Sequence, residues 1–134
     1  MSKRQVQTEQ APQAIGPYSQ AVVSGPFIFL SGQIGLDPET GTLVPGGTEA
    51  ETERVMQNLG TVLAAAGASF ADVVRATIYL VDLADFARVN EIYGRHFAAP
   101  YPARATVGVA ALPRGARVEI DLVAVKERLG NREA

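Results

Sequence analysis

The alternation of apolar and polar residues along the chain predicts strands of two kinds. A short continuous apolar run, FIFLS, is bounded by Gly-Pro and Gly and is typical of a strand buried on both faces. Elsewhere apolar and polar residues alternate, which gives a strand one apolar face and one mixed face. The predicted strands are an extended segment within 15–22, then 27–31, 72–81, 104–110 and 117–126.

Two amphipathic helices are predicted between these strands. Thr48-x-x-Glu51 is a capping box, in which the threonine caps the first turn and the glutamate reaches back to the backbone. Apolar residues then recur at helical spacing as far as Gly67, a natural helix stop. Asp82 can cap the second helix, and two prolines after it end it. These prolines are Pro100 and Pro102, and the apolar face of the second helix is Phe86, Val89, Tyr93 and Phe97.

The order of these elements is β-β-α-β-α-β-β, which predicts an α/β fold with one mixed sheet. Strands joined through a helix should run parallel, through right-handed crossovers, so both helices should cover the same face. The chain of 134 residues is long enough for one domain and too short for two. We therefore expect a single domain over 1–134, with loosely ordered tails at 1–13 and 127–134.

Two helices leave the second face of this sheet uncovered. The alternation assigns the following residues to it: Arg75, Thr77, Tyr79, Arg104, Thr106, Gly108, Arg117, Glu119, Asp121, Val123 and Val125. This set is semi-polar and contains arginine but no lysine, a composition more typical of a subunit interface than of a solvated surface. We predict an oligomer that buries this face, and a solvent-facing sheet is the weaker alternative.

Composition narrows the chemistry. The chain has no cysteine, one histidine (His96) and two lysines near its ends, so thiol nucleophiles, zinc clusters and Schiff-base mechanisms have poor candidates. The net charge of −2 argues against a nucleic-acid or acidic-membrane surface. We expect a cytoplasmic protein, because no apolar run approaches a secretory signal or the ~20 residues of a membrane helix. The groups that remain available for catalysis are carboxylates, hydroxyls, arginine, backbone groups and water.

Arg104 is unusual for a short, otherwise apolar strand, and it has two interpretations. It could form a cross-strand or inter-subunit ion pair with Glu119 or Asp121, which contributes ~0–1 kcal/mol if exposed. Alternatively, its planar guanidinium could bind a carboxylate ligand through two hydrogen bonds. Glu119 is likewise either an ion-pair partner or a carboxylate that orients or deprotonates water. For both residues the pattern alone favours the structural interpretation.

Three further residues are candidates for a binding site. Asn90 lies among the apolar residues of the second helix, where a buried amide needs hydrogen-bond partners; bonding to a loop and lining a pocket are equally supported. Tyr18 follows a Gly-Pro turn and is either a packing aromatic or a site residue. Gly32 either serves a turn or lets a ligand approach the backbone. His96 is interpreted as structural.

Nearly the whole chain, from about Thr8 to Lys126, resembles the RidA/YjgF family of reactive-intermediate (enamine/imine) deaminases. The matching segments are APQAIGPYSQA, FLSGQIGLDPETG, the helix ending in AAAGAS, VVRATIYLVDLADFARVNEIYGRHF and YPARATVGVAALPRGARVEIDLVAV. The resemblance implies a chorismate-mutase-like α+β fold of about five to six strands, assembled as a homotrimer with sites between subunits. It also implies that the final strand lies between the first two core strands, which argues against a direct Arg104–Asp121 pair.

The resemblance implies a site for a 2-imino acid, without metal or bound cofactor. Arg104 would bind the substrate carboxylate, and Glu119 would hold the attacking water and assist proton transfer. The other residues implied are Tyr18, counted with the catalytic residues, and Gly32, Asn90 and Thr106 as substrate-binding residues. Close relatives often have cysteine where Thr106 stands, so the rate or substrate preference could differ.

The implied activity is the hydrolysis of 2-iminobutanoate and 2-iminopropanoate to 2-keto acids and ammonia. One alternative is a deaminase of a different enamine, for example an aminoacrylate from pyrimidine breakdown. Another is a non-catalytic trimer that binds small ligands or acts like a chaperone. The acidic charge balance counts against a ribonuclease. The sequence leaves open the physiological substrate and which chain supplies each residue of an interface site.

Overall fold

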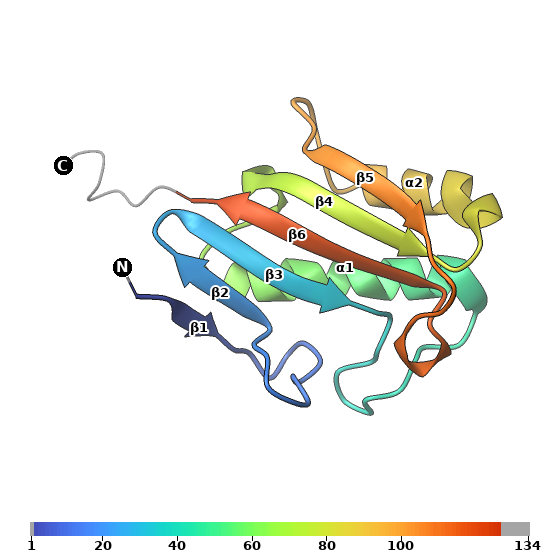
Figure 1. Ribbon diagram of the computed structural model, residues 1–134, viewed down its shortest axis with the longest axis horizontal. Coiled ribbons are helices and arrows are strands. Elements are labelled where there is room, and N and C mark those ends of the chain that lie inside the picture. Colours follow the sequence, from blue (N-terminus) through green and yellow to red (C-terminus); the bar gives the residue numbers. More distant parts are fainter. Residues whose placement is uncertain (1, 127–134) are drawn as a thin grey trace.

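The computed structural model describes residues 2–126, in which six strands form one mixed sheet with two α-helices on one side (Figure 1). The strands are β1 (Arg4–Val6), β2 (Ala21–Ser24), β3 (Phe27–Gln33), β4 (Val73–Leu80), β5 (Ala103–Gly108) and β6 (Val118–Val125). The helices are α1 (Gly47–Ala65) and α2 (Phe86–Gly94). The predicted α+β architecture with both helices on one face is therefore confirmed.

The order of the strands in the sheet is β1-β2-β3-β6-β4-β5. β4 and β5, which α2 connects, run parallel as predicted. β6 pairs antiparallel with both β3 and β4, so those two strands also point in the same direction. β6 thus lies inside the sheet and β5 lies at its edge, so the last two strands form no hairpin.

The core lies between the sheet and α1, because both present their apolar residues to this layer. Val55, Leu59 and Leu63 of α1 are fully buried, as are Ile78 of β4 and Ile120 of β6. Burying one such side chain contributes about 1.5–3 kcal/mol. Within residues 2–126, no helix is long and apolar enough to cross a membrane.

The N-terminal segment is an ordered part of the fold over residues 4–12, so the prediction of a loose tail over 1–13 does not hold for them. β1 pairs antiparallel with β2, and Val6 and Ala11 are buried. The side-chain amide of Gln20 accepts a hydrogen bond from the Thr8 N–H at 2.7 Å and donates to the Pro12 carbonyl at 2.8 Å. These contacts join segments distant in sequence, which local polarity cannot reveal. The other predicted tail, 127–134, lies outside the described residues.

The first helix does not begin with the predicted capping box. Its N-cap is Gly46, with no side-chain cap. Thr48 and Glu51 instead bind Arg117: its Nε donates to Thr48 Oγ1 at 2.6 Å and its backbone N–H donates to Glu51 Oε1 at 2.8 Å. Glu51 is buried, and a partner from the sheet satisfies its carboxylate in place of the helix backbone. The predicted stop is confirmed, since Gly67 follows the helix with a φ of +84°.

The second helix differs from prediction at both ends. Asp82 accepts from the Ala84 N–H at 2.9 Å and so caps a 3-10 turn, Leu83–Asp85, which leads into α2. The helix ends at Gly94, well before the prolines. Its predicted apolar face is confirmed for Val89 and Tyr93, which are buried. Phe97 lies beyond the helix, and Asn90, predicted to be a buried amide, is exposed.

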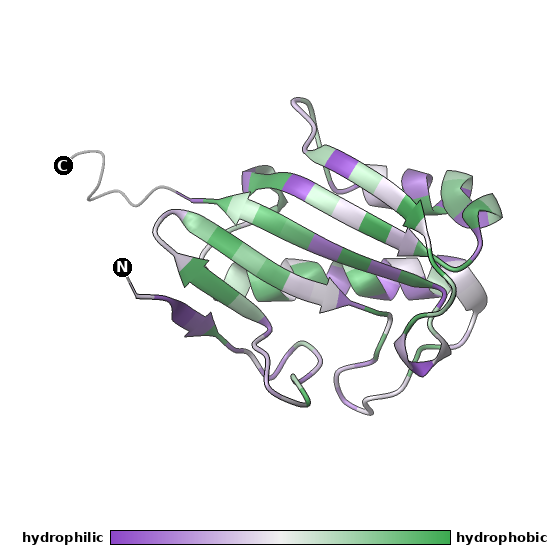
Figure 2. Ribbon diagram, in the orientation of Figure 1, coloured by the Kyte–Doolittle hydropathy of each residue, from purple (hydrophilic) through white to green (hydrophobic). Residues whose placement is uncertain are grey.

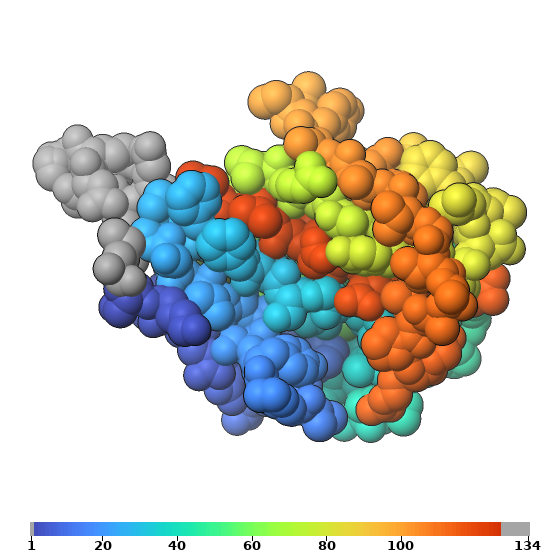
Figure 3. Space-filling model, viewed as in Figure 1, coloured from blue at the N-terminus to red at the C-terminus, as the bar shows by residue number. Residues whose placement is uncertain are grey.

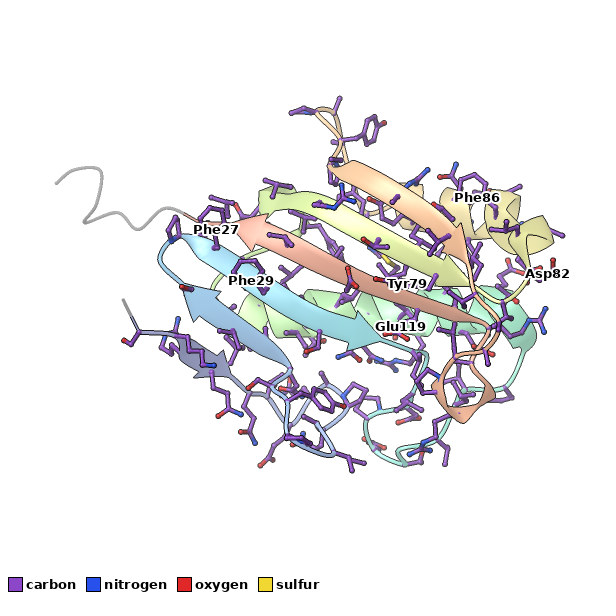
Figure 4. The ribbon with its side chains drawn as sticks, in the orientation of Figure 1. Phe27, Phe29, Tyr79, Asp82, Phe86 and Glu119 are labelled. Atoms are coloured by element: carbon purple, nitrogen blue, oxygen red, sulfur yellow. The ribbon has the colours of Figure 1, made fainter. Side chains whose placement is uncertain are left out.

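Two strands expose apolar residues that the pattern places in the core. In β3, Phe27 and Phe29 are 46% and 47% exposed, so the prediction of burial on both faces is wrong for a single chain (Figure 4). In β4, a register shift between Val73 and Arg75 buries Val73 and leaves Val74 46% exposed. The phenylalanines are exposed because no layer formed by residues 2–126 covers their side of the sheet (Figure 1).

Candidate active site

Arg104 and Thr106 lie on the helix-covered face of the sheet. The register pairs Arg104 with Ala76 and Thr106 with Ile78, and both partners are buried beneath the helices. Residues directly opposite one another share a face, so the prediction that places Arg104, Thr106 and Gly108 on the uncovered face is wrong. β5 is an edge strand, so its side chains on the helix-covered face remain accessible to solvent. The polarity of a residue in this strand therefore does not show which face it is on. Its residues on the uncovered face are Ala103, Ala105 and Val107.

The second helix holds the guanidinium of Arg104 in a defined position. Arg104 Nη1 donates to Asn90 Oδ1 at 2.7 Å. The guanidinium carbon lies 5.0 Å from the ring centroid of Tyr93 and 5.4 Å from that of Phe86, which is cation–π geometry. In the described part of the chain no carboxylate forms an ion pair with Arg104. The interpretation of a cross-strand ion pair within one chain is therefore wrong, and most of the five guanidinium N–H donors remain available to a ligand or to a neighbouring subunit.

A surface hollow of about 460 Å³ adjoins this guanidinium. It is lined by Asn90, Tyr93, Gly94, Tyr101, Pro102 and Arg104. The buried hydroxyl of Tyr93 has no hydrogen-bond partner among residues 2–126. Burial raises the pKa of Tyr93, and the positive charge of Arg104 opposes that rise. The volume is within the range of small-molecule sites, and the Arg104 donors favour an anionic group there.

Glu119 lies on the opposite, uncovered face. It is directly across from Tyr79 of β4, and both side chains point out of the sheet in Figure 4. Its carboxylate lies over Gly32 of β3: a Cβ added to Gly32 would be 2.9 Å from Glu119 Cδ. Burial, followed by the negative charge of Asp121, raises the pKa of Glu119. Gly32 therefore makes room for the carboxylate, which its tendency to form turns does not reveal.

The loop that carries Tyr18 is bound to β3 next to Gly32 by the two residues that follow Tyr18. Ser31 Oγ donates to the Ser19 carbonyl at 2.6 Å, and the Ser31 N–H donates to the Gln20 carbonyl at 3.0 Å. These two bonds fasten the Tyr18 loop to β3 immediately before Gly32. The ring of Tyr18 is 54% exposed, so it does not pack in the core of this chain.

The predicted site residues therefore form two groups. Tyr18, Gly32 and Glu119 make up what we name the carboxylate group, and Asn90, Arg104 and Thr106 make up the arginine group. Arg104 and Glu119 lie on opposite faces, and β4 separates their strands. One chain does not bring the two groups together. Nor do residues 2–126 contain three or more His, Cys, Asp or Glu side chains grouped to hold a metal ion.

The sequence pattern did not indicate four residues that shape these groups. Phe86 and Tyr93 were assigned only to the apolar face of a helix, yet both rings contact Arg104. The pattern assigns Tyr79 only to the uncovered face and offers Asp121 as an ion-pair partner of Arg104, yet the Tyr79 hydroxyl donates to Asp121 Oδ2 at 2.9 Å. The sequence does show polar residues on both neighbouring strands. Which of them contact each other can be stated only once the register of the strands is known.

A family model described as Endoribonuclease L-PSP matches residues 8–126. Protein DfrA of Myxococcus xanthus is 60% identical over 127 residues, which cover 93% of this chain and 97% of that protein. A mouse protein named 2-iminobutanoate/2-iminopropanoate deaminase is 52% identical over 124 residues, covering 92% of each chain. The crystal structure of a putative endoribonuclease from Thermotoga maritima has a TM-score of 0.90 and 54% identity, covering 93% of this chain and 98% of that one.

Proposed function

Since this chain belongs to the RidA/YjgF family, whose model is described as Endoribonuclease L-PSP, we propose that it hydrolyses reactive 2-imino and 2-enamino acids to 2-keto acids and ammonia. The substrates proposed are 2-iminobutanoate and 2-iminopropanoate, after the mouse relative. The observation that carries the proposal is the positioned guanidinium of Arg104 beside a hollow that suits a small carboxylic acid. We further propose that the enzyme is cytoplasmic and needs no metal or bound cofactor.

Arg104 binds the substrate carboxylate in this mechanism and so fixes the imine carbon relative to the protein. Glu119, as the carboxylate, takes a proton from water while the water oxygen bonds to the carbon of the protonated imine and the C=N electron pair moves to nitrogen. The product of this step is a neutral carbinolamine. Glu119 then gives its proton to nitrogen. As a carboxylate again, it takes the hydroxyl proton while the C–N bond breaks, the C=O bond forms and ammonia leaves. A raised pKa suits Glu119 to both steps, because efficient acid–base groups titrate near the working pH.

We infer that a second copy of the chain completes the site, in a homotrimer with clefts between subunits. The carboxylate group of one subunit would face the arginine group of its neighbour, which accounts for their positions on opposite faces of one sheet. The uncovered face supports this assembly. Phe27 and Phe29 of β3 are exposed on it, and Figure 2 colours β2 and β3 mostly hydrophobic, with hydrophilic positions along β6. No helix within residues 2–126 covers it (Figure 3).

Phe29→Lys should disrupt the oligomer. Phe27 and Phe29 pack with ring centroids 6.1 Å apart and are about half-exposed in one chain. Burying such a ring in an interface contributes about 1.5–3 kcal/mol per subunit, and a buried lysine adds a desolvation cost. Sedimentation velocity should show smaller species, and imine hydrolysis should fall with them. Ala64→Lys, on an exposed position of α1, is the control. An unchanged oligomer for Phe29→Lys would contradict burial of this face.

The activity itself is tested with 2-iminobutanoate released in situ from threonine by a pyridoxal-phosphate dehydratase. The wild-type protein should shorten the lifetime of the imine, measured by its capture with semicarbazide. If the oligomer is intact and the lifetime is unchanged, the chain is a non-catalytic binding protein. If the protein accelerates the loss of an aminoacrylate from pyrimidine breakdown but not of 2-iminobutanoate or 2-iminopropanoate, the enzyme acts on a different enamine.

Gly32→Ala should impair catalysis without unfolding the protein. The new methyl group would occupy the space of the Glu119 carboxylate, which can move because it is the end of a flexible side chain. Displacing a catalytic group by about 1 Å costs up to ~100-fold in rate. We expect kcat to fall by about 10–100-fold with nearly unchanged thermal unfolding. Gly41→Ala is a poor control because of its φ of +73°, so Ala64→Ser, at an exposed position of α1, serves as the control and should keep wild-type kcat. Wild-type kcat in Gly32→Ala would disprove the placement of Glu119.

A further inference from the structure

Asp121 lies beside Glu119 on the uncovered face and has no part in the mechanism above. The two carboxylates are alternate residues of β6, so their side chains leave the sheet in the same direction, about 7 Å apart along the strand. Both are half-buried. Two carboxylates so close repel each other when both are charged. A hydrogen-bond donor to Asp121 is therefore needed to stabilise its charge beside Glu119.

Tyr79 holds Asp121. Its hydroxyl donates to Asp121 Oδ2 at 2.9 Å, although the register places Tyr79 opposite Glu119 and Thr77 opposite Asp121. The tyrosine therefore lies between the two carboxylates and gives its one hydrogen bond to Asp121. Hydrogen bonds to charged acceptors are the stronger ones, so this bond fixes the aspartate charge near Glu119.

The remaining neighbours of Glu119 supply no compensating charge within the described part of the chain. β3 presents Gly32, which has no side chain, whereas Gln33 pairs with Ile120 and is buried on the helix-covered face. Arg75 of β4 is opposite Val123, farther along the strand, and makes no ion pair with either carboxylate. Arg117 of β6 directs its guanidinium to Thr48 and Asp85. Glu119 thus has a negative charge beside it and lies across from Tyr79 (Figure 4), whose hydroxyl already donates to Asp121.

We propose that Asp121 is a positioning residue that acts through Glu119. Its charge, fixed by the Tyr79 hydroxyl, favours the protonated form of Glu119 and makes that carboxyl a stronger base for the attacking water. The inference rests on the proposed function. It agrees with the direction in which Asp121 moves the pKa of Glu119, second to burial. Asp121 touches neither substrate nor water in this scheme, so it should affect proton transfer and not substrate binding.

Asp121→Asn tests this, because asparagine keeps the shape and can still accept the Tyr79 hydrogen bond while the charge is lost. A group with a raised pKa loses part of that rise when one cause is removed. The acidic limb of the pH profile of kcat/KM should therefore move to lower pH, and kcat at neutral pH should fall severalfold while KM is unchanged. Asp121→Glu, which retains the charge, should restore the wild-type profile.

A second readout needs no substrate: the side-chain carboxyl of Glu119 is titrated by ¹³C NMR in the assembled protein. Its midpoint should move to lower pH in Asp121→Asn and return in Asp121→Glu. If the midpoints move but no variant hydrolyses imines, the proposed function fails and the coupling stands. An unmoved midpoint overturns the inference. Should Asp121→Asn fail to assemble, the wild-type curve decides, because coupled carboxyls titrate in two steps and an isolated one in a single step.

Discussion

Arg104→Ala should lower kcat/KM for 2-iminobutanoate by about 100-fold, mostly through KM. A hydrogen bond to a charged group contributes about 1.5–3 kcal/mol, and 1.4 kcal/mol corresponds to about tenfold. The guanidinium is already oriented by Asn90 at 2.7 Å and by the rings of Tyr93 and Phe86, so little freedom is lost when it binds the carboxylate. Removing it therefore removes preorganised binding. The measurement is initial rate against imine concentration.

Two variants make this result specific. Arg104→Lys keeps the charge but lacks the planar pair of donors, so it should recover only part of the loss. Arg88→Ala is the matched control: Arg88 is also an arginine at α2, and it makes surface ion pairs with Glu49 and Glu91. Such pairs contribute about 0–1 kcal/mol, so activity should be retained. Full activity in Arg104→Ala would show that the substrate carboxylate binds elsewhere.

The pattern of apolar and polar residues predicted most elements of the fold, because a helix or strand with one buried face repeats its apolar residues at the period of that element. α1 and β6 are buried on one side along their whole length, and their apolar residues recur as expected. The parallel pair β4 and β5 followed from the helix between them. Local signals failed where a distant partner competes for the same atoms. Thr48 and Glu51 satisfy the capping pattern, yet they bind Arg117 of the sheet.

The site was harder to predict because the period identifies which residues share a face but not which face is covered. In β5 the polar alternates are Arg104 and Thr106, and polarity placed them away from the helices. The structure places both side chains on the side of α2, where Asn90 accepts a hydrogen bond from Arg104. Polar side chains are tolerated there because α2 covers this edge strand only in part. The resemblance implied the site residues, whereas their division between two faces required the register.

That division changes the assembly from an incidental property to a requirement of the proposed chemistry. A guanidinium on one face and a carboxylate on the other cannot bind the two ends of one small imino acid within a single chain. The exposed Phe27 and Phe29 on the carboxylate side supply the apolar area that a neighbouring subunit could bury. The same contact that stabilises the oligomer would then form the site.

Glu119→Gln should lower kcat by about 100-fold or more with little change in KM, because general acid–base catalysis contributes about 10²–10⁴. Glutamine keeps the size above Gly32, so the fold should be unaffected, but it cannot accept a proton from water. Single-turnover decay of the imine measures the effect. Glu53→Gln, at an exposed carboxylate of α1 that pairs with Arg95, is the control and should retain activity. Wild-type kcat in Glu119→Gln would remove this residue from proton transfer.

Mixing the two inactive variants tests whether neighbouring subunits share a site. In a ring where each site takes Glu119 from one chain and Arg104 from the next, an equal random mixture of Arg104→Ala and Glu119→Gln has both residues intact in about one site in four. Refolding the variants together should therefore restore about a quarter of the wild-type activity, while each variant refolded alone stays inactive. If both residues of a site came from one chain, no mixture could contain an intact site, and activity would remain at the level of the separate variants.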